Sequence, residues 1–304
     1  MALDADLIVD RRRLKRRLNF WCLLALALIV AVVIIAVGRF DLLAERGDRV
    51  ARLAVSGVLH DNFRRGDLLK NIRDNVNIRA LIVHINSPGG TVVGGEALYQ
   101  GLKDVAGTKP VVAVLGELAT SAAYMAAVGA DHIIARAGTV TGSIGVLMQT
   151  ADITGMLKNL GIAPVSIKSS PLKAQPSPLE PFTDEARTAT RDVVSDMYAM
   201  FVDMLVEGRA MNRDRVLVLA DGRIFTGRQA LAHGLIDAIG AEPEARQWLA
   251  ANRNVALDLP AVDVEVEERD GGWTGLLSSL IGKTLFSERL TLDGLLSVWH
   301  PNIR

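Results

Sequence analysis

The stretch Pro110-Val-Val-Ala-Val-Leu-Gly-Glu-Leu-Ala-Thr-Ser121-Ala-Ala-Tyr-Met-Ala-Ala127 decides the fold class of this chain. Its first six residues are apolar and rich in valine, which predicts a short buried strand at 110–115. Its last seven residues are strong helix formers. A turn therefore leads from strand to helix, and Ser121 on the first helical turn faces free backbone N–H groups and a positive dipole end. A role as N-cap for Ser121 or Thr120 is the alternative.

Strands and helices alternate on both sides of this stretch. The expected strands are 50–58, of edge type, 80–85 and 132–135, and the expected helices are 67–75, 96–104 and 184–208. Such alternation with short loops predicts an α/β core with a largely parallel sheet.

The composition excludes several classes of protein. The chain has 304 residues, 50% hydrophobic and 22% charged, which is enough for one large core or two modest ones. A formal net charge of zero gives no electrostatic case for a nucleic-acid partner. The single Cys22 excludes disulfides, thiolate metal clusters and cysteine catalysis. We expect neither a metal nor a cofactor.

Residues 20–38 form an apolar run without charge that is long enough to cross a bilayer as a helix. The basic segment 11–17 precedes it, whereas Arg39, Arg46 and Arg49 after it are offset by acidic residues. This asymmetry predicts a cytoplasmic N-terminus, with the residues beyond 39 across the membrane. A cleaved signal peptide is the alternative, but the run exceeds the usual length of a signal-peptide core.

Three loops supply further candidate residues. Asn86-Ser-Pro-Gly-Gly90 follows the expected strand 80–85, and its glycines permit close backbone approach and leave N–H groups available. Such a loop can form an oxyanion hole, and an ordinary strand-to-helix turn is the alternative. The other two loops are Thr141-Gly-Ser-Ile-Gly145, which presents Ser143, and the proline-rich stretch 167–178, which cannot be helical throughout.

A serine nucleophile needs a base. His84 and His132 lie in or beside expected strands, where a packing role is favoured. A lysine kept neutral by burial can act instead, as in known Ser–Lys pairs. Lys168 and Lys173 flank Ser-Ser-Pro-Leu in the third loop. For both lysines the alternative is a solvated surface position.

Five segments, taken together, carry a family resemblance. In chain order they are Asn86-Ser-Pro-Gly-Gly90, Ala119-Thr-Ser-Ala-Ala-Tyr124, Thr141-Gly-Ser-Ile-Gly145, Ile167-Lys-Ser-Ser-Pro-Leu-Lys173, and Asp221-Gly-Arg-Ile-Phe-Thr-Gly-Arg-Gln-Ala230 with Gly234-Leu-Ile-Asp237. Each is weak alone, but their order and spacing resemble those of the signal peptide peptidase A family, also called protease IV. The resemblance covers about residues 50 to 250 and corresponds to the short form with one copy of the repeat.

The resemblance implies a membrane-anchored serine endopeptidase with a crotonase- and Clp-like α/β fold. The residues it assigns are Ser121 as nucleophile, Lys173 as general base, Ser143 as the group that orients the lysine, Gly90 as oxyanion-hole donor, and Gly89, Ala122 and Ala123 as substrate contacts. Lys168 is the alternative base, although Lys173 fits the family spacing better. Many members have Ser-Gly-Gly where this chain has Ser121-Ala-Ala.

The expected organisation is a basic tail at 1–19, an anchor at 20–38, a linker at 39–49, a peptidase domain at 50–250 and a C-terminal extension at 251–304. The resemblance implies remnant signal peptides or other apolar peptides as substrates. It also implies a homo-oligomeric ring in the bacterial inner membrane, with sites shared between protomers on the periplasmic side. The apolar stretch 273–281 and the long helix from 184 are candidates for burial against a partner copy or the lipid, and the amphipathic stretch 290–299 is interpreted as an ordinary packing element. The alternatives are a catalytically silent membrane scaffold and a crotonase-type acyl-CoA enzyme.

Overall fold

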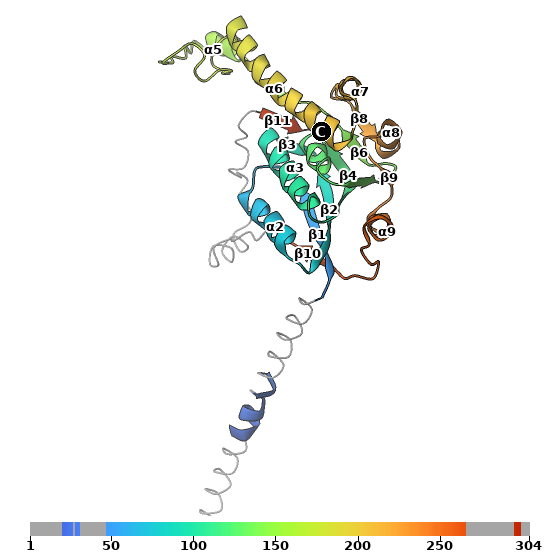
Figure 1. Cartoon of the computed structure of the whole chain (residues 1–304). Helices are drawn as coiled ribbons and strands as arrows, with labels where there is room; N and C mark the ends of the chain where they lie inside the picture. The colour runs from blue at the N-terminus through green and yellow to red at the C-terminus, as the bar shows by residue number, and fades with distance from the viewer. Residues whose placement is uncertain (1–19, 27, 31–46, 266–294, 299–304) are drawn as a thin grey trace, which may run out of the picture. The chain divides into compact units, whose positions relative to one another are not determined.

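The structure is a computed structural model, which describes residues 20–26, 28–30, 47–265 and 295–298 (Figure 1). The chain divides into two units, residues 1–48 and 49–304. In the first unit, residues 20–26 and 28–30 are helical, and the rest of the expected anchor lies outside the described residues. No helix in the described part of the chain combines the length and the apolar character needed to span a bilayer.

Eight of the described strands form the main sheet of the second unit. Its central order is β10 (Ala261–Val264), β1 (Arg49–Ser56), β2 (Ile78–Ser87), β4 (Val111–Thr120), β5 (His132–Ala135) and β9 (Ala238–Ile239). The short strands β6 (Val140–Gly142) and β8 (Ile224–Thr226) extend it from the end of β4. β6 and β8 pair antiparallel, and the other pairings within this sheet are parallel. This confirms the predicted α/β core, while its likeness to crotonase and Clp folds stays a prediction.

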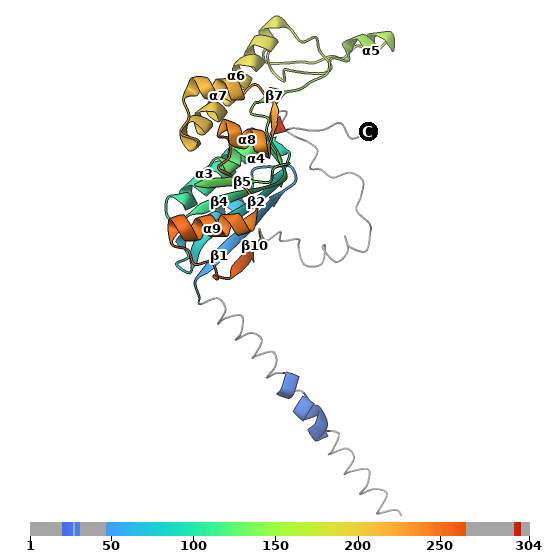
Figure 2. The same cartoon turned by 90° about the vertical axis from the view of Figure 1, so that its right-hand side faces the viewer.

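Helices cover both faces of this sheet (Figures 1 and 2). One face packs against α2 (Phe63–Asp74), α3 (Val92–Ala106), α4 (Ala122–Ala127) and the C-terminal half of α6 (Asp184–Gly208). The other face packs against α9 (Glu242–Arg253). Three shorter helices complete the unit: α5 (Thr154–Asn159), α7 (Arg213–Leu219) and α8 (Gly227–His233).

Strand β2 shows why the sequence pattern of this sheet is a continuous apolar run. Leu81, Val83 and Ile85 belong to the larger core under α2, α3 and α4. Ala80 and Ile82 alternate with them and belong to the smaller core under α9. Because successive side chains of a strand point to opposite faces, a strand covered on both faces has no polar positions in its centre.

The expected strand at 132–135 and the expected helix at 184–208 match β5 and α6. The edge position expected for the first strand was wrong, because β10 pairs in parallel with β1 and forms the edge instead. A side-chain contact supports this pairing, since Arg52 Nη1 donates to Asp263 Oδ1 at 2.8 Å. Residue 250, the expected end of the peptidase domain, falls inside α9, and β10 adds residues as far as Val264 to the main sheet. The domain division itself stays a prediction.

A second sheet contains three described strands. β11 (Leu295–Val298) lies between β3 (Gly89–Thr91) and β7 (Leu147–Met148) and runs antiparallel to both. Figure 1 shows β11 beside β3. β11 therefore falls within the amphipathic stretch 290–299. The stretch 273–281 lies outside the described residues.

Candidate active site

Ser121 lies where β4 passes into α4, in an unusual backbone conformation. Its φ of 57° and ψ of −122° are rare for a residue other than glycine. The Ser121 N–H donates to the Gly142 carbonyl at 2.8 Å, and its carbonyl accepts from Met125 N at 2.8 Å. The side chain makes no capping hydrogen bond to α4, although Ser121 holds the N-cap position and is only 1% exposed. The geometry does not support the N-cap alternative for Ser121.

Ser143 is brought beside Ser121 by the register of two parallel strands. Thr120 of β4 pairs with Gly142 of β6, so the two serines follow paired residues. Ser143 also has a positive φ, of 51°, and its N–H donates to Arg223 O at 2.8 Å. Both serines line one pocket of about 460 Å³. Its other lining residues are Ile144, Gly145, Val146, Leu147, Val194, Ser195, Tyr198, Ala220, Asp221 and Gly222.

The wall of this pocket that α6 forms was not anticipated from the sequence. Val194, Ser195 and Tyr198 share one face of the helix, as residues i, i+1 and i+4 do. The Tyr198 hydroxyl donates to Ala220 O at 2.8 Å, and burial raises the pKa of Tyr198. The spacing alone could have grouped these residues, but no sequence signal indicated which structure their face contacts.

The loop after β2 is tied directly to the residue that precedes Ser121. Thr120 Oγ1 donates to Pro88 O at 3.1 Å. Within the loop, Gly89 N donates to Ser87 Oγ at 3.1 Å, and Gly89 has a φ of 106° that favours glycine. This loop and the nucleophile candidate are therefore held in a fixed relation.

Gly90 lies against the backbone of Leu59. A Cβ at Gly90 would lie 1.9 Å from Leu59 O, so only glycine fits there. Leu59 N donates to Gly89 O, and Thr91 N donates to Leu59 O, each at 2.8 Å. Because the peptide groups of successive strand residues alternate in direction, the N–H of Gly90 faces the side opposite Leu59. That side carries β11.

Residues 221–227 hold in place the turn that carries Ser143. Arg223 O accepts the Ser143 N–H, and Phe225 pairs with Thr141 across β6 and β8. A Cβ at Gly227 would lie 2.0 Å from Arg136 O, so this position also requires glycine. The segment places one wall of the pocket and fixes the turn that presents Ser143.

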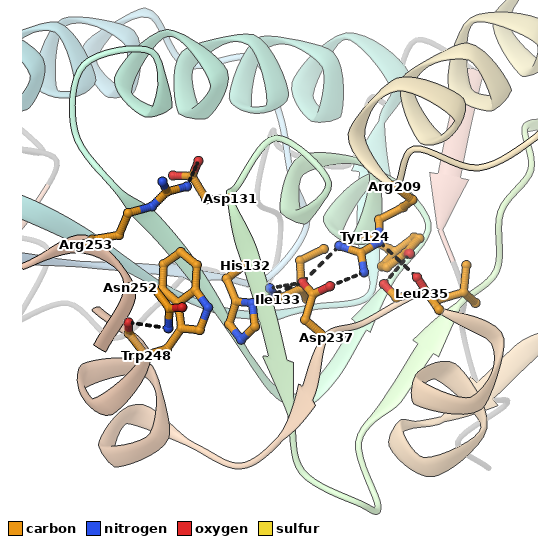
Figure 3. Close-up of polar contacts among 11 residues, drawn as sticks. Tyr124, Asp131, His132, Ile133, Arg209, Leu235, Asp237, Trp248, Asn252 and Arg253 are labelled. Carbon is orange, nitrogen blue, oxygen red and sulfur yellow. Dashed lines mark hydrogen bonds and ion pairs between the residues drawn. The ribbon is translucent and has the colours of Figure 1, made fainter. Parts of the chain in front are cut away.

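Residues 234–237 hold α4 and α6 from behind (Figure 3). The Tyr124 hydroxyl donates to Leu235 O at 2.6 Å, which fixes the helix that follows Ser121. Asp237 accepts from Ile133 N at 2.7 Å and from both terminal nitrogens of Arg209, at 3.0 and 2.5 Å. These residues support α4 and α6, and none of them is among the described residues that line the pocket.

The two candidate histidines have structural surroundings. His132 stacks on Trp248 with ring centroids 4.5 Å apart, and burial lowers the pKa of His132 (Figure 3). His84 Nε2 lies 3.0 Å from Glu242 Oε2. Neither histidine is among the described residues that line the Ser121 pocket, which agrees with the packing role that the sequence favoured.

Within one chain, Lys173 is not brought to Ser121. No lysine is among the described residues that line the pocket. Figures 1 and 2 show α5 and the loop after it, which contains both candidate lysines, beside the N-terminal part of α6. About 15 Å of helix separate Asp184 at that end from Val194 at the pocket.

The two candidate lysines differ in their contacts. Lys168 is ion-paired with Glu180, whose carboxylate also accepts from Gln175 Nε2 at 2.7 Å. The Lys173 side chain is exposed, and its backbone N–H donates to Ser170 O at 3.1 Å. Lys168 is thus committed to a local contact, whereas the amine of Lys173 is accessible.

The remaining predicted residues lie next to the pocket without lining it. Ala122 and Ala123 are fully buried behind Ser121 in the larger core, and Gly89 is part of β3. Their contact with substrate stays a prediction. Among the described residues, no group of three or more His, Cys, Asp or Glu side chains could hold a metal ion.

Comparison with known proteins places this site in a family. The profile of Peptidase family S49 matches residues 103–256, which include Ser121, Ser143 and Lys173. This chain belongs to peptidase family S49. The predicted relationship to the signal peptide peptidase A family is thereby confirmed, and the activity of the family is that of a protease.

Three relatives agree with this assignment. "Putative protease slr0021" of Synechocystis sp. is 38% identical over 204 residues, which cover 66% of this chain and 73% of the relative. "Putative signal peptide peptidase SppA" of Enterococcus faecium is 29% identical, over 83% of this chain and 77% of the relative. "Serine protease SPPA, chloroplastic" of Arabidopsis thaliana is 30% identical, over 75% of this chain but 34% of the relative.

Proposed function

We propose that this S49 protease is a serine endopeptidase whose nucleophile is Ser121 and whose general base is Lys173 of a neighbouring copy. Its substrates are extended apolar peptides, of which remnant signal peptides are the leading candidates. One observation supports the proposal above all: Ser121, in a rare backbone conformation, opens with Ser143 into a pocket whose described lining contains no lysine and no histidine.

The chemistry assigned to these residues is acyl transfer. The neutral Lys173 amine takes the proton of Ser121 Oγ as that oxygen attacks the peptide carbonyl. The N–H of Gly90 stabilises the tetrahedral oxyanion, and Ser143 orients the lysine. The lysine then protonates the departing amine and leaves an acyl-enzyme on Ser121. Water, deprotonated by the same lysine, releases the acid and restores the serine.

The surface around Lys173 supports a site shared between copies. We call residues 149–183 the arm. In the arm, the side chains of Val165 and Ile167 are 86% and 100% exposed, and those of Met156, Leu160 and Ile162 are also exposed. Monomers rarely display so many large apolar side chains together. Packing of the arm against a second copy would bury them, remove water from the Lys173 amine and favour its neutral form.

The proposed location is the bacterial inner membrane. The apolar run 20–38 and the basic segment 11–17 support a retained anchor with a cytoplasmic N-terminus and a periplasmic protease domain. Protease added outside spheroplasts should digest residues beyond 49 and spare an N-terminal tag. Release of the domain into the soluble fraction would support the signal-peptide alternative.

Active-site labelling tests the nucleophile. A fluorophosphonate probe should label the full chain and fail on Ser121→Ala, while Ser195→Ala, which changes another serine of the same pocket, should label normally. Absence of labelling in the wild-type chain, with no cleavage of apolar peptides, would contradict the proposal and favour the silent scaffold. Labelling that persists in Ser121→Ala would place the nucleophile elsewhere.

Subunit mixing tests the shared site. Ser121→Ala and Lys173→Ala should each be inactive alone. A co-assembled mixture should regain about a quarter or more of wild-type turnover, because some interfaces then join an intact serine to an intact lysine. A mixture as inactive as its parents would show that both residues must belong to one chain.

A further inference from the structure

β11 pairs with two strands that adjoin the candidate site. β11 lies between β3, which carries Gly90, and β7, which begins at the pocket residue Leu147. β11 is thus flanked by the candidate oxyanion loop on one side and by the segment after Ser143 on the other, and we call the space between these two strand edges the groove. An extended backbone that runs antiparallel to both edges is how a peptide binds by strand addition.

The register puts β11 over the candidate oxyanion donor. Ser297 pairs with Gly90, Leu296 pairs with Thr91 and with Leu147, and Val298 pairs with Gly89. Because Gly89 and Thr91 direct their hydrogen bonds toward Leu59, the peptide groups of Gly90 face Ser297. The backbone of β11 therefore covers the N–H that the proposed mechanism uses.

We infer that the C-terminal segment of this chain is a built-in inhibitor that occupies the substrate groove as a strand and must leave before a peptide can bind. The inference rests on the proposed function, because it takes the groove between β3 and β7 as the place where substrate lies. It adds a regulator to that site: residues 295–298 compete with every extended substrate for the same two strand edges.

Chain length makes such competition effective but reversible. Residues 266–294 connect the last strand of the main sheet to β11. Such a covalent tether gives a binding segment an effective concentration on the order of 1 mM. Each edge contact of β11 spans two or three residue pairs, so the free segment should bind weakly. For an intrinsic Kd of about 0.1 to 1 mM, the tether would suppress activity roughly 2- to 10-fold.

Hydrogen exchange measures occupancy without relying on catalysis. It is done in the full chain with Ser121→Ala, so that no peptide bond is cut. Adding Ser297→Pro removes a strand N–H and should speed exchange of the Gly90 amide, which faces β11, roughly 2- to 10-fold. The matched change Ser297→Ala keeps the backbone and should leave that exchange unaltered. Equal exchange in all three chains would overturn the inference.

Kinetics then test inhibition in the active chain. Removal of residues 295–304 should raise kcat/KM for an extended apolar peptide 2- to 10-fold, chiefly through a lower KM. A synthetic peptide of residues 290–304 should restore the lower rate as a competitive inhibitor, which shows that the shortened chain is folded. No rise together with no competition would overturn the inference, as would rapid trimming of the segment by the wild-type chain, because a strand that is consumed does not inhibit.

These outcomes separate the inference from the proposed function. If Ser121 fails to label and no variant cleaves peptides, the proposed function falls, and the exchange experiment still reports whether β11 occupies the groove. If the probe labels Ser121 but Ser297→Pro changes neither exchange nor rate, the inhibitory role of β11 is wrong and the proposed protease function is retained.

Discussion

Ser121 and Lys173 lie in regions of opposite character. Around Ser121, the backbone is held by hydrogen bonds from neighbouring strands, and the preceding Thr120 is tied to the loop that carries Gly90. The arm that carries Lys173 exposes Val165 and Ile167 almost completely. Folding of one chain thus completes the nucleophile half of the proposed site. In the proposed mechanism, the half that supplies the base is completed by the surface of a second copy.

The largest expected effect comes from replacing one of the two candidate lysines with arginine. Lys173→Arg should lower kcat about 1,000-fold or more, because a guanidinium stays charged and cannot take the serine proton. Lys168→Arg should change kcat less than tenfold, since its ion pair with Glu180 can persist. Steady-state kinetics on one apolar peptide measure both. If Lys168→Arg is the inactive variant, the assignments of the two lysines must be exchanged.

A second change tests whether the arm is completed by assembly. Ile167→Asp places a charge on a fully exposed side chain, so the folding of a single chain should be unaffected. If the arm packs on another copy, the charge should shift the assembly toward smaller species and lower activity about tenfold or more. Sedimentation velocity and peptide cleavage measure the two effects. Asp at the exposed Val76, outside the arm, is the control and should change neither.

Much of the nucleophile half could be foreseen from local sequence, because a buried strand followed by a turn and a helix is a local pattern. The closeness of Ser121 and Ser143 required the register of β4 with β6, in which Thr120 pairs with Gly142, and no local pattern specifies a register. From the sequence, only the family resemblance indicated that the two serines belong to one site. The role of α6 in the pocket was missed for the same reason.

The C-terminal part of the domain was harder to predict. β10 has four residues and pairs with β1 from more than 200 positions away in the chain, so its short alternation gave no usable signal. β11 lies in a stretch interpreted as a packing element, and its place depends on pairing with β3 and β7, two strands distant from it in the chain. In both cases the pairing partner, rather than intrinsic propensity, selects the strand.

A substitution in the scaffold behind Ser121 should have a smaller effect, mainly on stability and less on the rate of the reaction. Tyr124→Phe removes a buried hydrogen bond to Leu235 O and should lower the free energy of unfolding by about 1–2 kcal/mol. Because this bond fixes the helix after Ser121, kcat should fall a few-fold as well. Urea unfolding and kinetics on the same preparation measure both. A matched Tyr198→Phe change, at the pocket wall, should alter KM more than stability.

The smallest effect is expected from the ion cluster far from the pocket, on the α9 face. Burial opposes the charge of Glu242, but hydrogen bonds from Arg52, Arg246 and His84 lower the pKa of Glu242 to about 2. A depressed carboxyl pKa stabilises the fold above the unfolded value of about 4.5, and this contribution is lost as the pH falls toward 2. Glu242→Gln should therefore cost about 1–2 kcal/mol at pH 7 and progressively less from pH 4.5 downward. Urea unfolding between pH 3 and 7 gives the slope, and kcat at pH 7 should stay within twofold of wild type. A large loss of kcat with unchanged stability would mean that the α9 face also takes part in building the site, and the contrast between a self-sufficient serine half and a dependent lysine half would have to be redrawn.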